Sequence, residues 1–423
     1  MSKLRHPLTS LNQGHWFKLI CGASYQHLPT VRNLTLAYAL AGADCVDVAA
    51  DSAIIAAARE AFSVAHYLTR TSSDLSGQGF VKPWLMVSLN DGEDPHFRKA
   101  EFDPNQCPAD CPRPCEAICP AQAIVLEPLA DGFSGVLQAL CYGCGRCLPI
   151  CPTQQISTRS YVSTPAAIAP LILEGVDAIE IHTQVGRQAD FQRLWQAIKP
   201  QIADLKAISI SCPDGEELID YLWSLYEIIG PLSAALLWQT DGRPMSGDIG
   251  DGTTRAAIKL SQKVLAADLP GYVQLAGGTN RYTVNKLTIL GLLKPLGKGQ
   301  THIGGAAQRQ TVAGVAYGSY ARTLLTPLLE QLELNSISDA HPTLNDRSNP
   351  TDEQSNPPRN SPLLVNHTPS PLTRLEDAPD LLFQAVRLAQ SLVFQLKGPN
   401  HGRVEINRPI YSSAKPIGIP LQN

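Results

Sequence analysis

The chain of 423 residues carries 34 basic and 38 acidic side chains, a formal net charge of −4, and 44% hydrophobic residues. That length and hydrophobic content are enough for a large barrel with insertions, while the near-neutral charge argues against binding nucleic acid through its phosphates. The N-terminus shows no apolar signal-peptide core and no stretch approaches 18 uninterrupted apolar residues, so we expect no export, no membrane span and a cytoplasmic location.

The first part of the chain alternates short apolar runs with stretches of helical periodicity. Strands are expected at 16–24, 44–51 and 83–91, with a helix after each of the first two. Residues 1–91 are therefore predicted to form the first part of an α/β barrel.

The same alternation resumes after a cysteine-rich insert at 92–160 and continues through residues 161–335. A helix is expected at 163–175, followed by five strands at 176–183, 205–212, 233–242, 272–280 and 311–319. Eight apolar strands connected by helices imply a parallel sheet covered on both faces. Eight units over roughly 250 residues match a TIM-type (β/α)8 barrel. A doubly wound open sheet has the same local pattern and is the alternative.

The composition changes after the predicted barrel. Residues 336–376 are rich in Pro, Asn, Ser and Asp, which predicts a disordered linker. Apolar residues at helical spacing, an acidic start and a Lys-Gly end predict a helix at 377–398. Residues 377–423 are thus expected to be a C-terminal helix and tail.

The second of two cysteine runs in the insert follows a known ligand pattern. Cys141, Cys144, Cys147 and Cys151, with Pro152, read C-x2-C-x2-C-x3-C-P, which is typical of ferredoxin-type [4Fe–4S] ligands. Structural zinc is the alternative, but it usually takes two well-separated ligand pairs rather than three cysteines in seven residues.

The first run, Cys107, Cys111, Cys115 and Cys119, keeps the Cys-Pro ending but has longer gaps. In the interleaved arrangement of two-cluster ferredoxins, the fourth cysteine of each run ligates the other cluster. The ligand sets would then be Cys107, Cys111, Cys115 and Cys151 for one cluster, and Cys141, Cys144, Cys147 and Cys119 for the other. The stretched gaps make the first cluster the candidate for a labile or three-iron [3Fe–4S] species. A single cluster with spare thiols is the alternative.

The C-terminal ends of the predicted strands are where a barrel carries its function. Gly277 and Gly278 follow the seventh strand, and Gly318 and Ser319 follow the eighth, where barrels commonly bind a phosphate or a flavin such as FMN. Such glycines also serve simply to close tight turns. The other polar candidates at these ends are Cys21, Asn90, His182, Cys212, Asp241, Arg281 and Arg322.

No acid–base constellation stands out among these candidates. Lys18 lies inside the first strand, and we expect it to be a surface lysine rather than a lumen residue that binds flavin. His182 is expected to be a hydrogen-bonded residue at a strand end. Cys21 and Cys212 are expected to be buried, inert thiols.

With these segments, the sequence resembles the cyanobacterial LdpA family of light-dependent-period iron–sulfur proteins. The resemblance covers about residues 5–330 and rests on the stretches HWFKLICGASYQHLP, GADCVDVAAD, CPADCPRPCEAICPAQAI, CYGCGRCLPICP and YVQLAGGTNRYT. It implies that the eight cysteines bind clusters, and that the protein senses cellular redox state as a proxy for light. It also implies association with circadian clock-input proteins.

Two functions follow as hypotheses. The first is a redox-sensing regulatory protein whose clusters respond to an electron donor such as ferredoxin or the quinone pool. The second is a flavin-dependent TIM-barrel oxidoreductase that receives electrons through a ferredoxin-like insert. The weak acid–base set favours the first, and the glycine-rich ends of strands seven and eight favour the second.

Overall fold

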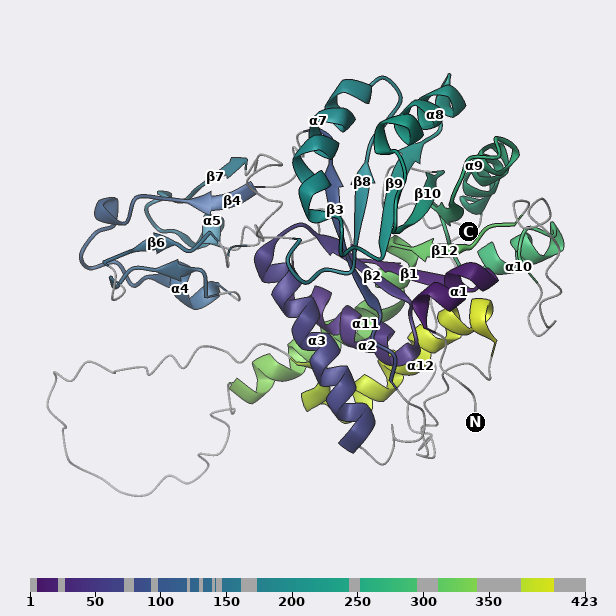
Figure 1. The fold of residues 1–423 in the computed structure, drawn as a ribbon. Coiled ribbons are helices and arrows are strands. Elements are labelled where there is room, and N and C mark those ends of the chain that lie inside the picture. Colours follow the sequence, from purple (N-terminus) through teal and green to yellow (C-terminus); the bar gives the residue numbers. More distant parts are fainter. Residues whose placement is uncertain are drawn as a thin grey trace, which may run out of the picture.

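The computed structural model describes most of the chain as a barrel with one insert (Figure 1). The described residues are 6–21, 27–71, 80–92, 98–119, 122–128, 132–138, 141, 147–160, 173–242, 252–294, 311–340 and 374–398.

Eight parallel strands close into a barrel in the order β1-β12-β11-β10-β9-β8-β3-β2. Their bounds are β1 (Trp16–Ile20), β2 (Cys45–Ala49), β3 (Trp84–Asn90), β8 (Ala178–His182), β9 (Ala207–Pro213), β10 (Ala235–Asp241), β11 (Tyr272–Ala276) and β12 (Gly314–Tyr317). Each strand pairs with its neighbours in chain order, and β12 returns to β1. The predicted TIM-type barrel is confirmed and the open doubly wound sheet is wrong, since the sheet has no edge.

Closure of the barrel depends on a glycine. Gly314 on β12 pairs with Trp16 on β1, and a Cβ at this glycine would lie 2.0 Å from the Trp16 carbonyl oxygen. No other residue type fits so close an approach without moving one of the strands.

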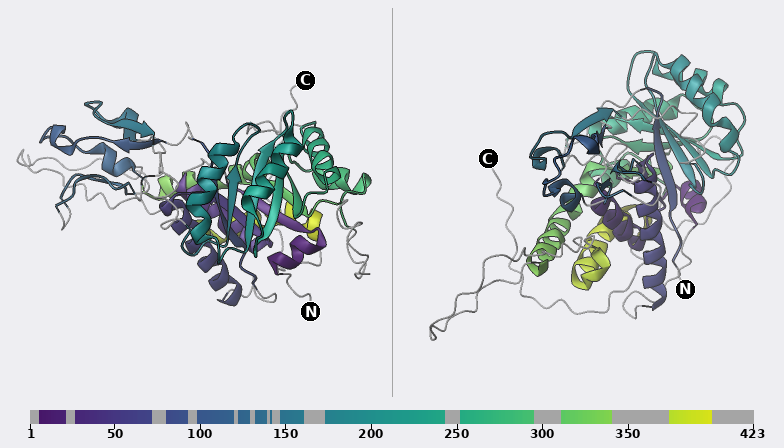
Figure 2. Two further views of the ribbon diagram at one scale, coloured as in Figure 1. Left: turned by 45° about the horizontal axis from the view of Figure 1, so that its top comes forward. Right: turned by 90° about the vertical axis from the view of Figure 1, so that its left-hand side faces the viewer.

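Helices cover the outside of the barrel (Figures 1 and 2). They are α2 (Leu28–Ala41), α3 (Ser52–Thr71), α7 (Gln188–Ile198), α8 (Leu218–Ile229), α9 (Thr254–Ala266), α10 (Thr283–Ile289), α11 (Ser319–Ala340) and α12 (Pro379–Lys397), with short 3-10 turns η2 (Lys199–Gln201) and η4 (Leu375–Asp377). The short helix α1 (Pro7–Gln13) instead packs Leu11 against the apolar residues at one end of the lumen. The main hydrophobic core lies between these helices and the outer face of the strands.

The C-terminal helix α12 is part of this outer layer. It packs against α2 and α11, and its apolar face is buried. Lys397 at its end donates to Asp44 Oδ1 and to the Gly42 carbonyl, both at 2.7 Å. At its start, Glu376 on η4 forms a salt bridge with the buried Arg32 of α2. The helix predicted at 377–398 is therefore present and docked on the barrel.

Several predicted segments lie outside the described residues. They include most of the helix expected at 163–175, residues 341–373 of the linker expected at 336–376, and the tail after 398; the first residues of that linker, 336–340, belong instead to α11, and its last two to η4. The disorder of that linker and the domain boundaries stay predictions.

The insert between β3 and β8 projects from one side of the barrel (Figures 1 and 2). Its elements are β4 (Arg98–Glu101), η1 (Pro104–Gln106), α4 (Pro114–Ile118), β5 (Ile124–Val125), β6 (Gly135–Val136), α5 (Cys147–Ile150) and β7 (Ser157–Ser160). Strand β4 pairs antiparallel with β7, and β5 pairs antiparallel with β6. The insert has a small hydrophobic core of its own, made largely of cysteines and short apolar side chains.

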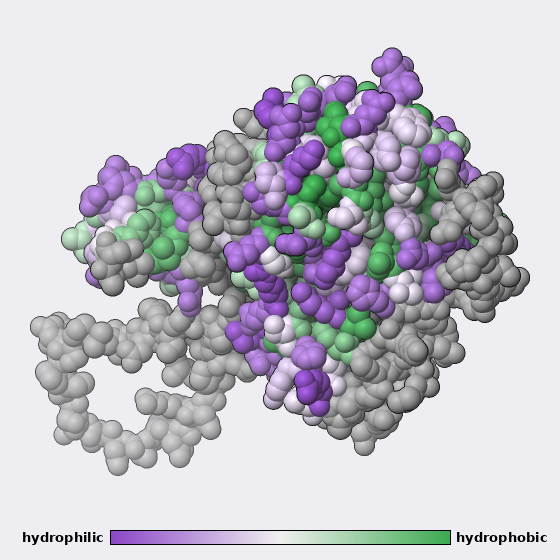
Figure 3. Space-filling view, viewed as in Figure 1, coloured by the Kyte–Doolittle hydropathy of each residue, from purple (hydrophilic) through white to green (hydrophobic). Residues whose placement is uncertain are grey.

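On the face seen in Figure 3, hydrophilic residues are interspersed with hydrophobic ones on both the barrel and the insert. In the described part of the chain, no helix has the length and apolar character needed to cross a membrane.

Candidate functional site

Seven of the eight predicted cluster cysteines lie among the described residues of the insert. Cys115, Cys141, Cys147 and Cys151 are buried, and Cys107, Cys111 and Cys119 are half-buried. Cys144 lies outside the described residues. None of the described cysteines forms a disulfide, so these thiols are available as ligands.

The thiols assigned to the first cluster influence one another. Burial raises the pKa of the Cys107 thiol, and the neighbouring Cys111 and Cys151 raise it further. Burial likewise raises the pKa of Cys115 to about 11, with Cys151 adding to the effect. Cys151, from the second run, is thus an electrostatic neighbour of the first run, as the interleaved arrangement requires.

Cys151 sits in a nest of hydrogen-bond donors. Burial opposes its ionisation, but the Thr153 hydroxyl and the backbone N–H groups of Gln155, Ile156 and Thr153 lower the pKa of this thiol to about 7. The Thr153 Oγ1 lies 3.5 Å from Cys151 Sγ. Donors aimed at a sulfur favour the thiolate, which is the form that binds metal.

The described thiols of the second set lie in the same small core. Cys147 begins α5, which packs on α4, and Cys119 follows α4 directly. The Cys119 Sγ accepts a hydrogen bond of 3.2 Å from the Ala123 N–H. The Cys141 N–H donates to the Leu137 carbonyl at 3.0 Å.

The donor set suits an iron–sulfur cluster. It consists of thiols on two short helices and their flanking turns, shielded by Ala123, Ile124 and Ile156. Among the described residues, no three acidic, histidine or cysteine side chains converge on the position of a single metal ion. A cluster spreads its cysteines over several irons, so its ligands need not meet at one point.

The insert is tied to the barrel by a buried lysine. Lys99 on β4 places its Nζ 2.8 Å from Asp51 Oδ2, just beyond β2, and donates to the Gln138 carbonyl at 2.5 Å. Asp51 also accepts hydrogen bonds from the Ala53 and Ile54 N–H groups at the start of α3. One ion pair thus joins the cysteine-rich segment to the end of the barrel where function is expected.

The predicted phosphate loops lie side by side at that end. Gly277 and Gly278 follow β11 with φ of 66° and 90°, and Thr279 Oγ1 donates to the Ala316 carbonyl of β12. A Cβ at Gly278 would lie 2.9 Å from the Thr253 carbonyl oxygen, so this glycine also serves the packing of α9. These glycines and Gly318 follow two strands that pair with each other, β11 and β12. Phosphate or flavin binding there stays a prediction.

The arginines proposed as charge partners of those loops have contacts of their own. Arg322 donates to the Ile20 carbonyl and to Ser319 Oγ, both at 3.1 Å. Arg281 stacks over the ring of Tyr282.

Lys18 is not a surface residue, and that prediction is wrong. Its side chain is fully buried in the barrel lumen, where Nζ lies 3.2 Å from Asp47 Oδ2 and forms a salt bridge with Glu180. Burial opposes the ammonium, but the two carboxylates hold the pKa of Lys18 above its ordinary value. The alternation of side chains along β1 turns this residue away from Phe17 and Leu19, which pack in the outer core.

Lys18 is part of a polar layer that crosses the lumen. Glu180 accepts from Ser209 Oγ at 2.8 Å and from Gln239 Nε2 at 2.7 Å, and Ser88 Oγ donates to Asp47 Oδ1 at 2.8 Å. Below the layer lie apolar residues that include Trp16, Trp84, Met86 and Leu237. The sequence analysis missed Asp47 and Glu180, although each stands alone among apolar neighbours in a buried strand.

The carboxylates of this layer differ in their ease of ionisation. Burial raises the pKa of Asp47 to about 6 despite the nearby Lys18. For Glu180, burial is outweighed by Lys18, His182 and hydrogen bonds, which hold the pKa of this carboxyl below its ordinary value.

The other candidates at the C-terminal ends of the strands include His182, Cys21 and Cys212, which are placed as expected. His182 is hydrogen-bonded at the end of β8, with Nε2 3.2 Å from Ser88 Oγ. Cys21 and Cys212 are buried, and burial raises the pKa of each thiol to about 12. These two thiols are therefore poor nucleophiles. Asn90 and Asp241 end β3 and β10 and are half-buried.

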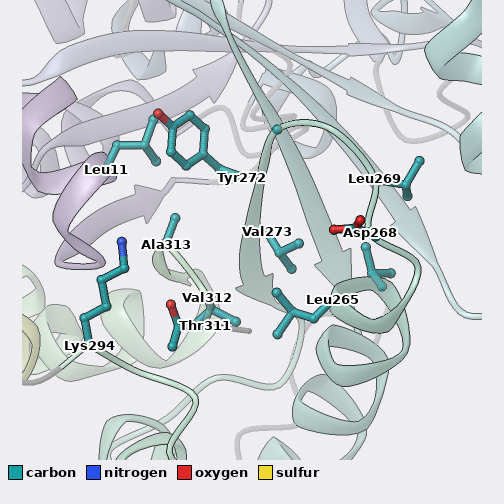
Figure 4. A pocket seen from close by; sticks show the side chains of 12 residues that line it. Leu11, Leu265, Asp268, Leu269, Tyr272, Val273, Lys294, Thr311, Val312 and Ala313 are labelled. Atoms are coloured by element: carbon teal, nitrogen blue, oxygen red, sulfur yellow. The ribbon is translucent and has the colours of Figure 1, made fainter. Parts of the chain in front are cut away.

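A cavity of about 370 Å³ lies at the opposite end of the barrel, where β11 and β12 begin (Figure 4). It is lined by Leu11, Tyr272, Lys294 and Thr311 among others, and Lys294 Nζ donates to the Asn12 carbonyl at 2.9 Å. None of the predicted site residues contributes to it.

Comparison with known proteins identifies the cysteine-rich segment. A profile of the LdpA Fe-S cluster-binding domain matches residues 107–162, and one of the Light dependent period A C-terminal domain matches residues 171–395. The curated protein Light dependent period A of Synechococcus elongatus is 53% identical over 338 residues, which cover 79% of this chain and 88% of that protein. The chain belongs to the LdpA family. The predicted resemblance is confirmed.

Membership in the LdpA family places the Fe-S cluster-binding domain on the insert described above. Its matched range includes all eight predicted ligand cysteines, so the coarse prediction of an iron–sulfur protein is confirmed. The number and type of clusters, and the assignment of each cysteine, stay predictions.

Proposed function

We propose that this LdpA-family protein is an iron–sulfur redox sensor that conveys the light-dependent redox state of the cell to the circadian clock. The observation that carries the proposal is the cysteine-lined core of the insert that projects from one side of the barrel. The printed name of the Synechococcus elongatus relative, Light dependent period A, supports the connection to light and period.

The insert would hold two clusters in a ferredoxin-like, interleaved arrangement. The electrostatic influence of Cys151 on Cys107 and Cys115 supports this assignment, because it places the last cysteine of the second run near the first run. Cys107, Cys111, Cys115 and Cys151 would bind one cluster, and Cys119, Cys141, Cys144 and Cys147 the other.

The first cluster would be the sensing one. The gaps between its cysteines are stretched, and two of its four ligands, Cys107 and Cys111, are half-buried; of the three described ligands of the second set, only Cys119 is half-buried. A cluster open to solvent reacts more readily with oxidants and loses iron more easily, which suits conversion between [4Fe–4S] and [3Fe–4S] forms. Electrons would reach the protein, in the cytoplasm, from ferredoxin or from the membrane quinone pool, and clock-input proteins would read the state of the insert.

Iron content and EPR spectra of anaerobically purified protein test the cluster assignment. Cys115→Ser and Cys151→Ser should remove the same EPR signal, and Cys119→Ser and Cys141→Ser the other. Cys212→Ser is the matched control, since this buried thiol lies outside the insert, and it should leave both signals intact. Loss of one common signal in all four variants would indicate a single cluster.

The clock function is tested in Synechococcus elongatus whose own relative is deleted. Expression of this chain should restore the light dependence of the circadian period, and Cys115→Ser should fail to do so at equal protein level. Equal restoration by Cys115→Ser would separate the clock function from the first cluster.

The second candidate function is a flavin-dependent oxidoreductase. It is favoured by the adjoining glycine turns after β11 and β12 and by the polar lumen beside them. The visible spectrum of the purified protein decides between the two. Flavin bands beside the iron–sulfur absorption would support the enzyme. Their absence after incubation with FMN and removal of the unbound FMN would exclude it.

A further inference from the structure

The cavity of about 370 Å³ lies between the C-terminal end of α9 and the starts of β11 and β12. Leu265, Leu269 and Val273 form an apolar wall on one side, and Lys294 lies on the opposite side (Figure 4). A hollow of this size, lined mainly by apolar side chains with a few polar groups, is typical of sites that bind small molecules. The chemistry of its polar groups therefore indicates which class of molecule it would take.

Lys294 places an ammonium group on the wall of the cavity. Its aliphatic stem packs on Gly14, where a Cβ would lie 3.4 Å from three of the stem carbons, and its Nζ donates to the Asn12 carbonyl at 2.9 Å. An ammonium has three protons, so two remain for a ligand. Among the described residues no carboxylate forms an ion pair with Lys294, and burial lowers the pKa of its ammonium. A negatively charged ligand would offset this loss of hydration.

Thr311 adds a hydroxyl group to the same part of the cavity wall. The Val312 N–H donates to the Leu292 carbonyl at 2.9 Å, so the segments that carry Thr311 and Lys294 run side by side. Within the described residues, Thr311 Oγ1 is buried and has no hydrogen-bond partner. A buried hydroxyl without a partner is unfavourable, so a ligand atom that accepts its proton would be stabilised here.

Asp268 limits the number of negative charges that a ligand can carry. It is an exposed residue that lines the cavity on the side away from Lys294 (Figure 4). If one carboxylate of an extended ligand is bound at Lys294, a second carboxylate at its far end would face Asp268 and be repelled. The cavity thus suits a molecule with one negative charge and an apolar body.

We propose that this cavity is a binding site for a small monocarboxylate with an apolar body, such as a medium-chain fatty acid. The carboxylate accepts hydrogen bonds from Lys294 Nζ and Thr311 Oγ1, and the hydrocarbon chain lies against Leu265, Leu269 and Val273. None of the residues that line the cavity belongs to the cysteine-rich insert. The site therefore does not depend on the proposed iron–sulfur function.

Calorimetric titration of the full-length protein with octanoate, octanamide and suberate tests the proposal. The three probes have chains of equal length and carry one, no and two negative charges. Wild type should bind octanoate, and it should bind suberate more weakly. Lys294→Met should weaken octanoate binding by at least about tenfold, because a hydrogen bond to a charged group is lost. The same change should weaken binding of the neutral octanamide much less.

Lys259→Met is the matched control, because this exposed lysine of α9 does not line the cavity. It should bind octanoate as wild type does. Leu265→Phe, which fills part of the cavity, should weaken octanoate and octanamide alike, and circular dichroism of every variant checks folding. The proposal is overturned if wild type does not bind octanoate, if Lys294→Met binds it equally well, or if suberate binds as tightly as octanoate.

Discussion

Lys99 of the insert and Asp51 of the barrel form a buried ion pair in which Nζ and Oδ2 lie 2.8 Å apart. Asp51 also caps α3 through the N–H groups of Ala53 and Ile54, and Lys99 also holds the Gln138 carbonyl. The pair therefore connects a helix of the barrel to Gln138, three residues before Cys141 in the chain. A movement of β4 in the insert would therefore act directly on the start of α3 through this ion pair.

A double-mutant cycle tests this link. Lys99→Gln should destabilise the protein because it leaves the Asp51 carboxylate buried without its cation. Asp51→Asn keeps a good capping residue and should cost less. Their coupling energy, from urea unfolding of the two single variants and the double variant, should be about 1–3 kcal/mol. Additive effects within about 0.5 kcal/mol would show that the pair does not couple insert and barrel.

Removal of the lumen ammonium should be among the most damaging single changes. Lys18→Met leaves Asp47 and Glu180 buried and facing each other without a cation. We expect a loss of about 3–5 kcal/mol in the free energy of unfolding, measured by urea titration at neutral pH. The matched control is Lys82→Met, because Lys82 is half exposed and lies 3.5 Å from Asp177. It should cost at most about 1 kcal/mol, and equal losses for the two variants would contradict the role given to the lumen layer.

The buried Asp47 predicts a specific dependence of stability on pH. Burial raises the pKa of Asp47 to about 6 in the folded protein, above its value in the unfolded chain. Between these two pKa values the folded state binds more protons than the unfolded state, so this group lowers stability as the pH rises through the window. Asp47→Asn removes the effect.

The measurement is the free energy of unfolding of wild type and Asp47→Asn between about pH 4 and 6.5. The difference between variant and wild type should shift in favour of the variant as the pH rises. Any loss of iron at low pH is common to both proteins and leaves this difference intact. A difference that is constant across the window would mean that Asp47 titrates alike in the folded and unfolded states.

The barrel could be predicted from sequence, whereas its polar layer could not. Lys18, Asp47 and Glu180 each stand between apolar neighbours, as in the stretches FKL, VDV and IEI. In a strand, this alternation places the charged side chain on the opposite face from its neighbours. Both faces of barrel strands are buried, so the pattern does not say which face is the lumen. Only closure of the sheet brings the three side chains together.

For the cysteine site, the chemistry could be predicted from sequence, whereas the arrangement of the segments in space could not. The ligand spacing in the second run predicted iron–sulfur chemistry from residue identities alone, because cluster ligation depends on a short local loop. The closeness of Cys151 to Cys107 depends on how α4 packs on α5, and the Lys99–Asp51 pair depends on how the insert meets the barrel. Contacts between distant segments of this kind leave no local pattern.

The hydrogen bonds to Cys151 should affect the reduction potential of the cluster that this cysteine is proposed to bind. Donors to a ligand sulfur stabilise the reduced, more negative form and so raise the reduction potential. Thr153→Val removes the hydroxyl 3.5 Å from Cys151 Sγ while keeping the shape of the side chain. If the insert holds the two proposed clusters, we expect a lower potential for the one bound by Cys151 and an unchanged potential for the other, measured by EPR-monitored redox titration. Thr158→Val on β7, the same substitution in the same insert, is the control and should change neither potential. A fall in the potential of the second cluster alone would instead assign Cys151 to the set that contains Cys141 and Cys147, and would refute the interleaved arrangement.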